Sequence, residues 1–194
     1  MNPHKLRLQR ERDELWAEAR DSMPLFEKFF TAGNTTHIED AEIGWVSIKL
    51  IITELYTYED EIKNISKEVL NIYSKEIKSG EIDTLKFANR EINLLKDKII
   101  EVGKNEETRE EVESNLEDIR KDIEIIRLIF LYNISKYNDV IGNMFLGVME
   151  DDSDWNGELT EEEQAAIARC KVATYYLLLL KEAEIESLDG SWFK

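Results

Sequence analysis

Apolar residues recur every three or four positions along several long stretches of the chain. The clearest case spans residues 85–102, where the apolar positions are Leu85, Ala88, Ile92, Leu95, Ile99 and Val102. This spacing puts apolar side chains on one face of an α-helix, and its persistence over several turns is typical of a helix in a bundle. The sequence therefore predicts an all-α fold: an elongated multi-helix bundle with coiled-coil-like packing.

Two longer stretches carry the same stripe. The apolar positions are Ala41, Trp45, Ile48, Ile52, Leu55, Ile62, Ile65, Val69 and Ile72 in the first, and Leu116, Ile119, Ile123, Ile126, Phe130, Ile134, Tyr137, Ile141, Met144 and Val148 in the second. We expect a long helix from Thr36 to about Gly80, with a candidate kink at residues 57–60. A helix over residues 106–150 would be roughly 65 Å long if unbroken. The step from Phe130 to Ile134 shifts its heptad phase.

The remaining helices are predicted at the two ends of the chain. Residues 4–21 indicate a mixed-charge helix, residues 24–30 a short one, and residues 160–186 the last long one. Residues 123–132 and 172–180 are apolar nearly all round, which predicts central burial.

We expect one helical domain over residues 1–194. Within it, the sequence predicts an N-terminal arm over 1–34, long bundle helices over 36–150, and a helix-loop-helix over 137–187.

The formal net charge of −17 changes the picture of the partners that the chain can bind. A surface this acidic repels nucleic-acid phosphates and anionic lipid, so we expect no direct binding to nucleic acid. It favours a protein partner, with a basic partner as one option. The longest apolar runs, such as residues 175–180, are too short to span a membrane. With one cysteine, Cys170, and no apolar signal segment at the start, the sequence predicts a cytoplasmic protein.

One stretch between the last two long helices has chemistry of its own. Residues 152–163 read DSDWNGELTEEE. Asp152, Asp154 and Asn156 alternate along the chain, so their side-chain oxygens can point inward together. Gly157 then permits a sharp turn, because glycine adopts the required backbone conformation cheaply. Calcium takes six to eight oxygen ligands, and a short loop supplies them in this way.

This pattern resembles the calcium-binding loop of the EF-hand family. The resemblance implies the ligands Asp152, Asp154, Asn156, the backbone carbonyl of Glu158, Thr160 acting through a water, and the bidentate carboxylate of Glu163. It implies Ca²⁺ as the bound ion, and it leaves competition by Mg²⁺ open. Thr160 and Glu163 also have the spacing of a capping box at the start of a helix.

EF-hands normally work in pairs, and no second loop is found in the sequence. The segment around Gly80 places Lys75, Ile77 and Ser79 where the first ligands belong. Three possibilities stay open: pairing in a homodimer, a lone site of about 10⁻⁵ to 10⁻³ M affinity, or a structural ion that fixes the angle between two helices.

Other candidate sites have weaker patterns. His4 and His37 lack the spacing of metal ligands, and Cys170 lies on the apolar side of its helix with no histidine nearby in sequence. Glu39 and Glu42 lie one turn apart, with Glu54 further along, which is similar to the magnesium-binding glutamates of all-α nucleotide pyrophosphohydrolases. The matching Glu-x-x-Asp motif of that class is missing downstream.

The leading hypothesis is a non-enzymatic helical interaction protein in which calcium sets the angle between the last two helices. The alternative is an acidic inhibitor or antagonist, of the phage or immunity type, that blocks a basic, nucleic-acid-binding site on a target protein. A magnesium-dependent nucleotide hydrolase is the third.

Overall fold

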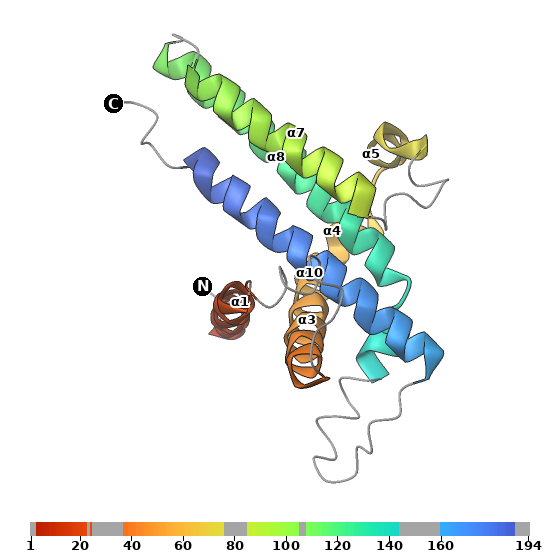
Figure 1. Cartoon of the computed structure of the whole chain (residues 1–194). Helices are drawn as coiled ribbons and strands as arrows, with labels where there is room; N and C mark the ends of the chain where they lie inside the picture. The colour runs from red at the N-terminus through yellow and green to blue at the C-terminus, as the bar shows by residue number, and fades with distance from the viewer. Residues whose placement is uncertain are drawn as a thin grey trace. The chain divides into compact units, whose positions relative to one another are not determined.

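The computed structural model describes residues 3–22, 24, 37–75, 85–104, 108–143 and 160–188. The regular elements within these ranges are helices (Figure 1), so the predicted all-α, multi-helix fold is confirmed. They are α1 (Pro3–Asp21), α3 (His37–Thr57), α4 (Glu59–Lys63), α5 (Lys67–Ile72), α7 (Leu85–Lys104), α8 (Arg109–Ser135) and α10 (Glu161–Leu188).

The chain divides into two compact units. Unit 1 comprises Met1–Glu59 and Ile134–Tyr175, and unit 2 comprises Asp60–Asn133 and Tyr176–Lys194. The boundary after Asn133 falls inside α8, and the boundary after Tyr175 falls inside α10. Each of these two helices therefore contributes residues to both units.

The core of unit 1 forms where α3 packs on the first half of α10. Helix α3 buries apolar side chains on more than one face, because Val46, Ile48, Leu50 and Ile51 are all buried. At Gly44 the two helices approach so closely that an added Cβ would lie 3.3 Å from Cγ2 of Ile167 and 3.6 Å from Cε of Lys171. An added Cβ would require the side chain of Ile167 to shift by a few tenths of an ångström.

Helix α1 is attached to α3 by a buried carboxylate. Glu54 is fully buried, and its Oε1 accepts hydrogen bonds from Nε of Arg12 at 2.6 Å and Nε1 of Trp16 at 2.9 Å. Nη2 of Arg12 also donates to Oε2 of Glu54 at 3.3 Å, and the guanidinium lies over the ring of Tyr58. Burial opposes the charge on Arg12, but its hydrogen bond to Glu54 and the carboxylate charge outweigh this and raise the pKa of the guanidinium. The charge on Glu54 is thereby compensated inside the unit.

In unit 2, α7 and α8 form an antiparallel pair. The predicted stripes are buried on both helices: Ile92, Leu95 and Ile99 on α7, and Leu116, Ile119, Ile123 and Ile126 on α8. An ion pair between Nζ of Lys98 and Oδ2 of Asp122, 2.9 Å apart, spans the two helices at the surface. The 3-4 pattern therefore predicted the core of this pair correctly.

The second half of α10 packs against α8 in the same unit. The rings of Phe130 and Tyr176 stack with centroids 6.2 Å apart. Arg127 is buried and pairs with Glu124 on its own helix and with Glu184 on α10, at 3.1 Å for the latter. Burial raises the pKa of the Glu184 carboxyl, but hydrogen bonds and charges from Lys181 and Arg127 outweigh it and lower the pKa overall.

The predicted long helices are interrupted in two regions. The first does not continue from residue 36 to about 80: α3 ends at Thr57, next to a turn at Tyr58, and α5 begins after residues 64–66, where the side chain of Ser66 accepts from the backbone N–H of Val69. The second ends at Ser135, before a turn at residues 136–137 and further helical residues 138–143. The kink near residues 57–60 is therefore confirmed, whereas the break at residues 64–66 was missed.

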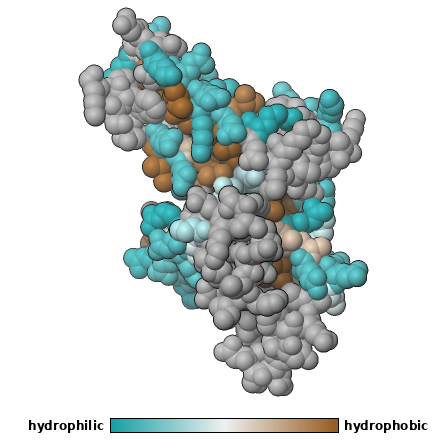
Figure 2. Space-filling model, viewed as in Figure 1, coloured by the Kyte–Doolittle hydropathy of each residue, from teal (hydrophilic) through white to brown (hydrophobic). Residues whose placement is uncertain are grey.

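The described helices expose a largely polar surface. In the view of Figure 2, hydrophilic side chains cover most of the coloured surface and apolar patches show between them. Within the ranges given above, no helix has the combination of length and apolar character needed to cross a membrane.

We predict that Arg12→Ala lowers the free energy of unfolding by about 3 kcal/mol, because it leaves the buried Glu54 carboxylate without its cation. Arg12→Lys keeps the positive charge but not the two-pronged contact, so it lowers the free energy of unfolding by less than Arg12→Ala does. Urea denaturation followed by circular dichroism measures both. Arg7→Ala, which removes an exposed ion pair with Glu11, is the control and leaves the midpoint unchanged. Equal effects at positions 7 and 12 would contradict the buried-pair argument.

Candidate metal site at the start of helix α10

The structure describes the C-terminal end of the predicted calcium loop. Thr160 and Glu163 lie within the described residues, at the start of α10. The other predicted ligands, Asp152, Asp154, Asn156 and Glu158, lie outside the described residues. Their arrangement around an ion therefore remains a prediction.

The predicted capping box at the start of α10 is confirmed. The backbone N–H of Thr160 donates to Oε2 of Glu163 at 2.8 Å, and the backbone N–H of Glu163 donates to Oγ1 of Thr160 at 3.2 Å. Each side chain thus satisfies a backbone donor that the first turn of a helix would leave unpaired. The carboxylate of Glu163 is held beside the segment that precedes the helix.

Helix α8 begins with the same kind of capping box. The backbone N–H of Thr108 donates to Oε2 of Glu111 at 2.9 Å, and that of Glu111 donates to Oγ1 of Thr108 at 3.3 Å. The backbone N–H and the hydroxyl of Thr108 both donate to the Glu111 carboxylate, and these two hydrogen bonds lower the pKa of that carboxyl. No Asp-x-Asp-x-Asn-Gly pattern precedes this box. The box alone is therefore a helix start, and only the residues before it distinguish α10 as a candidate metal site.

The helices on either side of residues 144–159 are fixed within unit 1. The guanidinium of Arg169 on α10 lies over the ring of Tyr137, 4.9 Å from its centroid, which is a cation–π contact. Ile141, in the helical residues 138–143, and Ala166 on α10 are both fully buried. The described segments before residue 144 and after residue 159 are thus held by packed side chains.

Of the other candidates considered from the sequence, the side chains of His4, His37, Glu39 and Glu42 lie outside the described residues. Among the described side chains, no three His, Cys, Asp or Glu residues converge in a way that could hold a metal ion. Glu54, the third glutamate of the hypothetical magnesium site, accepts hydrogen bonds from Arg12 and Trp16. Cys170 is fully buried, and burial raises the pKa of its thiol to about 12, so the thiolate is not available as a nucleophile near neutral pH.

The pairing of Arg12 and Trp16 with Glu54 was not predicted from the sequence. A signal was present, because Arg12 and Trp16 lie one turn apart on an otherwise highly charged helix and so share a face. The partner on α3 is separated from them by 42 and 38 residues, and the sequence alone gives no way to select it.

Comparisons with known proteins do not extend this picture: no protein-family model, curated protein or solved structure matches the chain. The site rests on its own residues.

We predict that Thr160→Ala lowers the free energy of unfolding by about 1 kcal/mol in the presence of a chelator, because α10 loses its N-terminal cap. Thr108→Ala removes the equivalent cap of α8 and is the matched comparison. Amide hydrogen exchange locates each effect, with faster exchange confined to the first turn of the helix that was changed. Faster exchange throughout the chain in either variant would contradict a local cap.

Proposed function

We propose that this chain is a non-enzymatic helical interaction protein in which residues 152–163 bind one calcium ion. The ion would set the direction in which α10 leaves the loop, and so the position of the surface that α10 presents to a partner. The observation that carries the proposal is a sequence with oxygen donors in EF-hand register that runs directly into the capped start of α10.

The start of α10 suits this role electrostatically. Its first turn carries Glu161, Glu162 and Glu163, and no basic residue stands between Asp151 and Gln164 in the sequence. A divalent cation relieves the mutual repulsion of these carboxylates and those of the loop. Calcium is preferred over magnesium because a loop that ends in a bidentate carboxylate supplies more oxygens than the six that magnesium takes.

Glu163 has two roles in this proposal that can be separated by experiment. As the third residue of the helix it accepts a hydrogen bond from Thr160, and as the last loop position it would bind the ion with both oxygens. Glutamine supports a capping box as glutamate does, but it offers only one ligand oxygen and no charge. Glu163→Gln therefore removes the ion ligand and keeps the helix start.

We predict saturable terbium luminescence sensitised by Trp155, with competition by calcium and an affinity of about 10⁻⁵ to 10⁻³ M. Glu163→Gln weakens binding at least about tenfold because it removes the bidentate ligand. Glu111→Gln makes the same exchange in the matching capping box of α8, and leaves the affinity unchanged. Absence of binding at millimolar ion, or an equal loss in both variants, would remove the calcium proposal.

A second function, an acidic antagonist of a basic protein, is favoured by the first half of α8. The exposed carboxylates there include Glu110, Glu113, Glu117 and Asp118. Basic side chains are fewer in this stretch, and Lys121 already pairs with Asp118 at 3.0 Å. Such a helix face can compete with the phosphates of nucleic acid for a basic surface.

For the antagonist function, we predict that the chain displaces nucleic acid from its target protein with a steep loss of potency as salt rises, with chelator present throughout. Glu113→Gln combined with Glu117→Gln weakens the displacement several-fold through loss of electrostatic attraction. Displacement that requires calcium, or that does not respond to salt, would favour the calcium-dependent interaction protein instead.

A further inference from the structure

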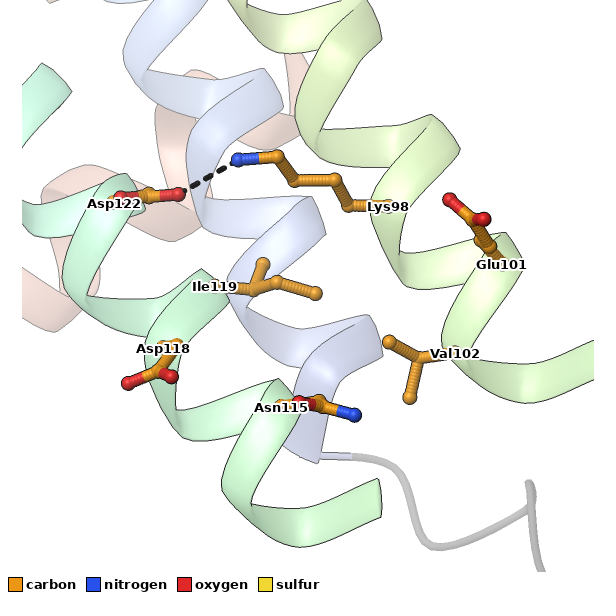
Figure 3. A pocket seen from close by; sticks show the side chains of 7 residues that line it. All are labelled: Lys98, Glu101, Val102, Asn115, Asp118, Ile119 and Asp122. Atoms are coloured by element: carbon orange, nitrogen blue, oxygen red, sulfur yellow. Dashed lines mark hydrogen bonds and ion pairs between the residues drawn. The ribbon is translucent and has the colours of Figure 1, made fainter. Parts of the chain in front are cut away.

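An open groove of about 300 Å³ lies between α7 and α8 in unit 2. Its lining combines an apolar floor with acidic walls: Lys98, Glu101, Val102, Asn115, Asp118, Ile119 and Asp122. Figure 3 shows Val102 and Ile119 pointing toward one another across the groove, with Lys98 reaching from α7 to Asp122 on α8. Every residue in the lining belongs to the same unit.

The ion pair in the groove shows how it accommodates a cation. The ammonium of Lys98 lies 2.9 Å from Oδ2 of Asp122, and the two side chains remain 53% and 44% exposed. An ion pair this exposed contributes little to stability. A cation from another molecule can therefore take the place of Lys98 at small cost, and an arginine does so with a two-pronged contact that lysine cannot make.

An exposed apolar residue, Leu94, lies on the same face of α7 as two residues of the groove lining. Leu94, Lys98 and Glu101 are separated by four and three residues and so share one face of the helix. Leu94 is 49% exposed, so its side chain is accessible to another molecule. This face of α7 therefore presents one apolar side chain followed by Lys98 and Glu101, and Asp122 of α8 pairs with Lys98 across the groove.

We propose that this groove is a docking site for a basic amphipathic helix of a protein partner. The partner's apolar residue would pack on Leu94 and its arginines, one turn further along, would pair with Asp122 and Glu101 in place of Lys98. The fit rests on charge complementarity with Glu101, Asp118 and Asp122 in the lining and on the position of Leu94 one turn before Lys98 on the same face of α7. It deepens the interaction function proposed above by naming the partner's chemistry, and it rests on that function but not on the calcium loop.

The test uses the full chain, with chelator present, and three fluorescein-labelled helical peptides. The peptides have the same composition, except that the third has its arginines exchanged. The first peptide carries one leucine and two arginines on one face, the second carries the same residues on opposite faces, and the third has glutamate in place of arginine. Fluorescence anisotropy gives each dissociation constant, and amide chemical shifts locate the bound surface. We expect the first peptide to bind at least about fivefold more tightly than the second, since both carry equal charge.

The lysine in the groove gives the most discriminating variant. Lys98→Gln removes the competing cation and is expected to tighten binding of the first peptide about two- to fivefold. Lys136→Gln changes the net charge equally but lies in unit 1, so it leaves binding almost unchanged. Glu101→Gln with Asp122→Asn weakens binding about tenfold, because both acceptors of the arginines are lost.

Three outcomes overturn the proposal. Equal binding of the first two peptides, or equal effects of Lys98→Gln and Lys136→Gln, would mean attraction by net charge alone. Shift changes outside residues 94–102 and 115–122 would place the binding elsewhere. A doubled mass in solution that Glu101→Gln reverses would make a second copy of the chain the occupant. Because chelator is present throughout, failure of the calcium loop alone leaves these results unchanged.

Discussion

The structure depends on covering two helices that are apolar nearly all round. The middle of α8 buries Ile123, Ile126, Ile129 and Leu131. Between residues 173 and 180, α10 buries Ala173, Tyr176, Leu177, Leu178 and Leu180. Transfer of such segments out of water is favourable only if neighbours cover every face. In unit 1, α3 packs closely on α10 at Gly44, and in unit 2, α7 packs along α8. Helices α3 and α7 are thus part of the cover that α10 and α8 require.

Polar groups inside this cover are kept by specific partners. The carboxylate of Glu54 in unit 1 receives N–H donors from Arg12 and Trp16, and the guanidinium of Arg127 in unit 2 receives carboxylates from Glu124 and Glu184. A buried charge is costly unless it is paired in this way. The side-chain hydroxyl of Thr174 is an exception, since it is buried without a hydrogen-bond partner. Both compensated pairs join residues far apart in sequence, and so they select which helices lie together.

The apolar pattern predicted most of the fold because it reports directly on burial. On α7, Ile92, Leu95 and Ile99 are buried as expected. On α8 the stripe from Leu116 to Ile134 is buried, and the capping box at Thr160 and Glu163 formed as predicted. The break at residues 64–66 was missed, since the stripe through Ile62, Ile65 and Val69 continues across it. Pairing of Arg12 with Glu54, and the groove beside Lys98, depend on contacts between helices that periodicity does not encode. The ligands Asp152, Asp154, Asn156 and Glu158 stay a prediction of sequence alone.

The enclosed thiol of Cys170 has a consequence for how this molecule responds to oxidants. Peroxides and disulfides react with a cysteine that is both ionised and accessible. Cys170 is kept as a thiol by a pKa of about 12, and it is inaccessible because it is fully buried. Since no other cysteine occurs in the chain, the native molecule has no route to covalent dimers through sulfur. Any association of the folded chain with a second protein then forms without a disulfide through Cys170.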